Sequence, residues 1–124
     1  MDLMPDIPQG RQVIEAYGDG GFRITGRRIE GSVIVAPSMQ LDWPVAAMDA
    51  LAPDSFDLMD QLPDAVEILL LGCGTSMAFL KPDIRAALKA RGVAVEPMDT
   101  GAACRTYNVL MAEDRRVAAA LIAI

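Results

Sequence analysis

Apolar and polar residues alternate in short runs along the first third of the chain, and glycine-rich turns separate these runs. This pattern is typical of β-strands with one face exposed to solvent. It predicts strands over residues 12–17 and 22–25, joined by the turn Gly18–Gly21. A further strand over 29–36 and a short one over 41–44 are expected to follow. We therefore expect an antiparallel meander in this part of the chain.

Longer apolar segments follow and predict a strand–helix–strand unit. The segment Ala65–Leu71, AVEILLL, is almost entirely apolar, as in a strand of a parallel sheet that is covered on both faces. Pro82 suits the first turn of a helix, and Gly92 suits the position after its last turn. Because extended sequence resumes at Val93–Glu96, we expect two parallel strands and a right-handed crossover through the helix.

Two further helices and an ambiguous tail complete the pattern. A short helix is expected to begin at Asp54 or Ser55, and a longer one at Asp99 or Thr100. The final eight residues, VAAALIAI, favour a helix by alanine propensity, but they are apolar throughout, as in a buried strand. The longer helix is expected to have an apolar face formed by Ala103, Tyr107, Leu110 and Met111. Near its end lie Arg115 and Arg116, where basic residues interact favourably with the helix dipole.

The length and charge of the chain limit its class. The 124 residues predict one domain over 1–124 that starts with an extended lead-in at 1–10. The net charge of −6 argues against sequence-independent binding to nucleic acid or to an anionic membrane surface. The N-terminus does not resemble a secretory signal, and the apolar stretch 68–80 is too short to span a bilayer, so we expect a cytoplasmic protein.

The chain contains no histidine, which removes histidine-based triads, imidazole metal sites and the usual general base at neutral pH. Its two cysteines, Cys73 and Cys104, lie in neither a zinc-binding nor a C-x-x-C spacing. The glycine-rich turn 72–76, GCGTS, lacks the third glycine of a dinucleotide-binding loop and the lysine of a Walker motif. We therefore predict no metal, no cofactor and no enzymatic activity.

Two polar segments, 72–76 and 100–108, follow the two strands of the predicted parallel pair. The carboxyl ends of parallel strands meet at one edge of a sheet, and ligands of open α/β folds collect there. The two segments therefore define a candidate functional edge. Its members are Gly72, Cys73, Gly74, Thr75, Thr100, Cys104, Arg105, Thr106, Tyr107 and Asn108.

Three interpretations of this edge stay open. The polar residues of 100–108 can simply begin a helix and bond to nearby backbone. Alternatively, the glycine backbone, Arg105 and Thr106 form a small-anion site in the crevice between the segments, in a ligand-binding protein or in an enzyme with a cysteine nucleophile. In the third interpretation, Cys73 and Cys104 approach each other as a thiol redox sensor.

Three segments together resemble one small protein family: VEILLLGCG at 66–74, ARGVAVEPMDT at 90–100 and AACRTYNVLMAEDRRVAAAL at 102–121. It is the domain-of-unknown-function 498 family, also called Mth938-like, and the similarity runs from about Gly10 to the end of the chain. The resemblance implies a three-layer α/β fold with flanking helices. Its central mixed sheet has one antiparallel strand, and an N-terminal β-hairpin packs alongside. In this fold the tail VAAALIAI is a strand.

The resemblance also implies a function. No catalytic activity is established for the family, and one mitochondrial member is a scaffold that helps to assemble respiratory complex I. We therefore expect a bacterial, non-enzymatic assembly or protein-interaction module, at most peripheral to the inner membrane. Its expected partners are proteins, with respiratory complex I subunits or assembly factors as the first candidates.

Overall fold

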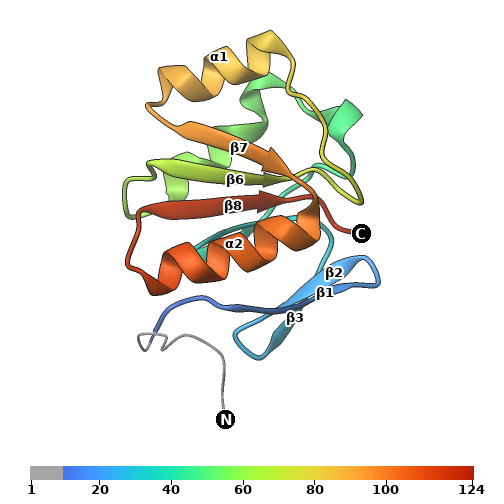
Figure 1. Ribbon diagram of the computed structural model, residues 1–124, viewed down its shortest axis with the longest axis vertical. Helices are drawn as coiled ribbons and strands as arrows, with labels where there is room; N and C mark the ends of the chain where they lie inside the picture. The colour runs from blue at the N-terminus through green and yellow to red at the C-terminus, as the bar shows by residue number, and fades with distance from the viewer. Residues whose placement is uncertain (1–9) are drawn as a thin grey trace.

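The computed structural model describes residues 10–124, which form two β-sheets, two α-helices and two short 3₁₀ helices (Figure 1). Of the predicted lead-in at 1–10, only Gly10 lies within the described residues. The strands are β1 Ile14–Gly18, β2 Gly21–Ile24, β3 Arg27–Glu30, β4 Val33–Ala36, β5 Met39–Asp42, β6 Ile68–Gly72, β7 Ala94–Met98 and β8 Val117–Leu121. The helices are η1 Met48–Ala50, η2 Pro53–Gln61, α1 Pro82–Ala90 and α2 Thr100–Ala112.

The central sheet has five strands in the order β5-β4-β8-β6-β7. Strand β6 pairs in parallel with both β7 and β8, whereas β4 is antiparallel to its neighbours β8 and β5. One strand, β4, therefore runs against the other four, as the family resemblance implies. The apolar tail is strand β8 in the middle of this sheet, which explains why all of its residues are apolar.

Both faces of the central sheet are covered, and successive side chains of a strand therefore enter two different cores. Leu69 and Leu71 pack on the face that α1 and η2 cover, while Leu70 packs on the face covered by α2. Beyond α2 lies the separate three-stranded sheet β1-β2-β3, and α1 lies at the opposite side of the molecule (Figure 1). This arrangement confirms the predicted three-layer α/β fold.

The largest departure from the predicted elements is the run 29–36, which was expected to form one strand. It is divided between β3 and β4, which belong to different sheets. The chain changes direction at Gly31, whose φ of 80° lies in the left-handed region that glycine adopts without a steric penalty. The meander therefore ends at β3, and β4 is free to join the central sheet beside β8.

The predicted helix near residue 54 is also different in detail. It is the 3₁₀ helix η2, and its N-cap is Ala52 rather than Asp54 or Ser55. Ser55 still contributes to the start of the helix, because its hydroxyl accepts a hydrogen bond of 2.9 Å from the Ala52 N–H. No helix within residues 10–124 has both the length and the apolar content needed to cross a membrane.

Candidate functional site

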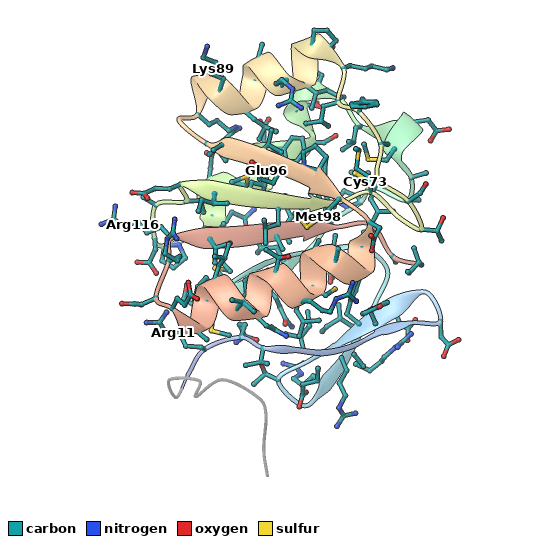
Figure 2. The ribbon with its side chains drawn as sticks, in the orientation of Figure 1. Arg11, Cys73, Lys89, Glu96, Met98 and Arg116 are labelled. Atoms are coloured by element: carbon teal, nitrogen blue, oxygen red, sulfur yellow. The ribbon has the colours of Figure 1, made fainter. Side chains whose placement is uncertain are left out.

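The segments 72–76 and 100–108 meet at one end of the central sheet, here called the carboxyl rim. Strands β6 and β7 are parallel and end in register, with Gly72 opposite Met98. The Thr100 N–H donates a 2.8 Å hydrogen bond to the Gly74 carbonyl, and the Gly74 N–H donates one of 2.9 Å to the Thr100 hydroxyl. These contacts bring the two segments together, as the strand directions predicted. Cys73 marks this end of the sheet in Figure 2.

Thr100 connects three parts of the carboxyl rim. Its side chain is fully buried, and its hydroxyl also donates a 2.7 Å hydrogen bond to the Ile122 carbonyl just after β8. Gly72 makes this approach possible, because a Cβ atom there would lie only 3.0 Å from the Thr100 hydroxyl and 3.0 Å from the Leu121 side chain. Both residues therefore hold the end of β6, the end of β8 and the start of α2 together.

Helix α2 begins as the polar pattern predicts, with Asp99 as its N-cap. The Asp99 carboxylate accepts a 2.8 Å hydrogen bond from the Ala102 N–H, and this satisfies one of the free donors of the first turn. Of the two predicted caps, Asp99 is therefore the one that the structure uses. Thr100 is the first helical residue and points into the protein.

Tyr107 and Asn108 bind the backbone near β1. The Tyr107 ring is fully buried, and its hydroxyl donates a 2.9 Å hydrogen bond to the Gln12 carbonyl. Burial raises the pKa of this phenol. The Asn108 amide donates a 2.7 Å hydrogen bond to the Ile14 carbonyl and accepts one of 3.0 Å from the Ile14 N–H. The two side chains attach the three-stranded sheet to α2.

The remaining members of the rim are closer to solvent. Thr75 and Arg105 are exposed, and Thr106 is half-buried. The Arg105 guanidinium donates a 3.3 Å hydrogen bond to the Tyr17 hydroxyl, so β1 also contributes to this surface. The small-anion site at Arg105 and Thr106 stays a prediction.

The two thiols belong to different cores. Cys73 packs with the side chains beneath α1 and η2, whereas Cys104 packs with those beneath α2. They therefore lie on opposite faces of the sheet, which argues against the third interpretation, in which the two sulfur atoms approach each other. Burial raises the pKa of the Cys104 thiol to about 12, which makes this side chain a poor nucleophile at neutral pH.

Three cavities among residues 10–124, with volumes of about 550, 440 and 270 Å³, are lined by no residue of the carboxyl rim. The largest lies at the opposite end of the sheet and was missed in the sequence, because four separate segments form it. The pair Arg115–Arg116 just before β8 could have indicated a charged site here, but from the sequence we related these residues only to the dipole of the preceding helix. Within the described residues, no group of three or more His, Cys, Asp or Glu side chains is placed to hold a metal ion.

The layers, the single antiparallel strand and the attached three-stranded sheet define an α/β protein of the Mth938-like class. A family model matches residues 14–122, and the chain belongs to this family, described as "Protein of unknown function (DUF498/DUF598)". A crystal structure of a Bordetella parapertussis protein is similar, with a TM-score of 0.84 and 38% identity over 94% of this chain and 100% of that one. A Bordetella pertussis protein described as a Mth938-like domain has a TM-score of 0.77 and 33% identity, over 98% of this chain and 91% of that one.

Several relatives of this chain share one name. The mouse protein named NADH dehydrogenase [ubiquinone] 1 alpha subcomplex assembly factor 3 is 36% identical over 120 residues, which cover 97% of this chain. The chain spans 64% of the length of that protein and 60% of its Xenopus tropicalis counterpart. An uncharacterised protein of Rhodobacter capsulatus is 38% identical, over 91% of this chain and 86% of its own length.

Proposed function

We propose that this protein is a non-catalytic assembly factor that binds other proteins, and that respiratory complex I subunits or their assembly factors are its partners. The relatives named assembly factor 3 support the class, because they align with nearly the whole described chain. The two thiols are the strongest nucleophiles in a chain without histidine, and both are buried. Because buried thiols are poorly accessible to a substrate, their burial supports a non-catalytic role.

The observation that carries the proposal is an exposed apolar pair on the loop between β6 and α1. Phe79 has 87% of its surface exposed and Met77 has 52%, whereas most other large apolar side chains of the described residues are buried or half-buried. Aromatic residues and methionine are enriched in the centres of protein interfaces. Covering a Phe side chain contributes about 1.5–3 kcal/mol, so this loop can anchor a partner.

The setting of the loop fits the same role. It leaves the sheet at the carboxyl rim, where Thr100 fixes its start through Gly74 and where Tyr17, 41% exposed, adds a further aromatic surface. Because the rim holds the start of the loop in place, less conformational entropy is lost when a partner binds its exposed apolar residues. The rim would therefore act as the support of an interaction surface.

A deletion strain of the host tests the proposal. We expect less assembled complex I on native gels and lower NADH:ubiquinone oxidoreductase activity in its membranes. The wild-type gene should restore both, whereas Met77→Ser combined with Phe79→Ser should restore much less. Loss of a central interface anchor costs about 2 kcal/mol or more, which is roughly a 30-fold weaker affinity.

Val109→Ser is the matched control, because Val109 is another exposed apolar residue, 49% accessible, on helix α2. It should restore complex I as well as the wild type does. Normal complex I in the deletion strain would contradict the proposed partner. Full rescue by the Met77/Phe79 variant would contradict the proposed surface while leaving the assembly role intact.

A further inference from the structure

A cavity of about 550 Å³ lies at the amino ends of β6 and β8, at the opposite end of the sheet from the carboxyl rim. The segments 62–66 and 114–117 lead into these two strands and form part of its wall. The segment 36–38 closes another side, because β4 is antiparallel and its carboxyl end therefore lies here. Residues 10–11 complete the lining. We call this space the amino-end cavity; Arg11 and Arg116 mark its end of the sheet in Figure 2.

The cavity has the dimensions of a small-molecule site and a partly apolar wall. Its volume falls within the range of about 300–1,000 Å³ that such sites occupy. Leu62, Val66 and Val117 give it an apolar surface, to which Ala36 and two prolines add. A ligand bound here would therefore be expected to carry a short apolar body.

The charged side chains that line the cavity have a small excess of positive charge, although the whole chain is acidic. Three arginines and two carboxylates, Asp64 and Asp114, line it. Arg11 is held by Asp114 at 2.8 Å, and Arg116 lies 3.6 Å from Glu67. Arg115 and Asp64 make no ion pair with any residue from 10 to 124, so the Arg115 guanidinium is available to a ligand.

The backbone that presents these arginines is unusual. Asp114 has a φ of 61°, in the left-handed region that glycine normally occupies after the end of a helix. The turn is fixed by two hydrogen bonds, 3.0 Å from the Asp114 N–H to the Met111 carbonyl and 3.0 Å from the Arg115 N–H to the Leu110 carbonyl. It ends α2 sharply and directs the chain past the cavity into β8.

We infer that the amino-end cavity binds a small organic anion, with a carboxylate or phosphate head group on a short apolar body. Arg115, with Arg116 beside it, holds the head group, since guanidinium groups bind carboxylates and phosphates through two parallel hydrogen bonds. Leu62 and Val66 contact the apolar body. This site is separate from the proposed protein-binding loop and does not depend on it.

Titration of the ¹⁵N-labelled protein, followed by NMR, tests the inference with three six-carbon probes: hexanoate, hexyl phosphate and the neutral hexanol. At least one of the two anions should cause saturable shifts confined to the backbone amides of the non-proline residues in 36–38, 62–66 and 114–117. Hexanol should bind about tenfold more weakly or worse, because it lacks the charge-assisted hydrogen bonds. The anion that binds more tightly identifies the head group.

Arg115→Gln should weaken binding of that anion about tenfold. The matched control is Arg85→Gln, which changes another exposed arginine on α1, away from the cavity, and should alter affinity less than twofold. Both positions are exposed, so both variants should fold. Equal binding of hexanol, shifts that do not saturate, or equal losses in the two variants would each overturn the inference.

Discussion

The two ends of the parallel strands contain similar polar residues but use them differently. At the carboxyl rim, the hydroxyl of Thr100 and the amide of Asn108 are bonded to backbone groups within the protein. At the amino end, Arg115 and Arg116 lie exposed beside a cavity. Polar residues next to the ends of strands therefore do not identify a ligand site by themselves. What distinguishes the two ends is that Thr100 and Asn108 are bonded inside the fold, whereas Arg115 makes no ion pair with any residue from 10 to 124.

The largest effect that sharpens this comparison is expected from Thr100→Val at the carboxyl rim. The substitution keeps the shape of the side chain but leaves the Gly74 N–H and the Ile122 carbonyl without their partner. Each buried unpaired group costs about 1–3 kcal/mol, so the free energy of unfolding should fall by roughly 2–5 kcal/mol. Urea unfolding followed by circular dichroism measures it.

Thr100→Ser is the matched control, because it retains the hydroxyl and removes one methyl group. Its free energy of unfolding should fall by only about 1 kcal/mol. If the valine variant is as stable as the serine variant, the hydroxyl does not hold the rim together, and the contrast between the two ends fails.

A second test concerns the pH dependence of stability at Cys104. Burial raises the pKa of this thiol from 9.0 to about 12 in the folded protein, so the folded state keeps its proton after the unfolded chain has lost it. The stabilisation is complete below pH 9 and is lost as pH rises from 9 toward 12. This group should therefore lower the free energy of unfolding by about 1.4 kcal/mol between pH 8 and 10.

The measurement is a set of urea unfolding curves at pH 8, 9 and 10 for the wild type and for Cys104→Ala. The alanine variant should show a smaller decrease over this interval. Since Tyr107 also has a raised pKa and is present in both proteins, the difference between their slopes isolates the thiol. Identical slopes would mean that the thiol is accessible to solvent at the rim.

The smallest effect is expected at the amino end, from Asp114→Gly. Glycine relieves the left-handed conformation of residue 114, worth about 1–2 kcal/mol, but it removes an exposed ion pair with Arg11 worth about 0–1 kcal/mol and makes the unfolded chain more flexible. The free energy of unfolding should thus change by less than about 1 kcal/mol. Asp114→Ala loses the same carboxylate and keeps the strain, so it should be less stable than the glycine variant by about 1 kcal/mol. A large loss in the glycine variant would show that the amino end is as tightly constrained as the rim.

Much of the fold could be predicted because its buried strands are apolar along their whole length. The runs around β6 and β8 are of this kind, and a capped helix was correctly placed at 99–100. The run 29–36 misled the prediction, because its residues continue to favour extended structure on both sides of Gly31. Propensity describes local conformation and does not specify which sheet a strand joins.

The position of the candidate edge could be predicted from the sequence, but the hydrogen bonds that its side chains make could not. Parallel strands bring 72–76 and 100–108 together, and this follows from chain direction alone. That Tyr107 and Asn108 bind the backbone at Gln12 and Ile14 could not be read from the sequence, since more than ninety residues separate the partners. The amino-end cavity was missed for the same reason.

The attachment of the three-stranded sheet through Asn108 has a consequence for sequence change. The amide binds the N–H and the carbonyl of residue 14, atoms that are the same in every amino acid except proline. Substitutions at the exposed positions 15 and 16 of β1 would therefore leave these two hydrogen bonds unaltered. The exposed side chains of this strand can thus change in evolution or engineering while its attachment to α2 persists.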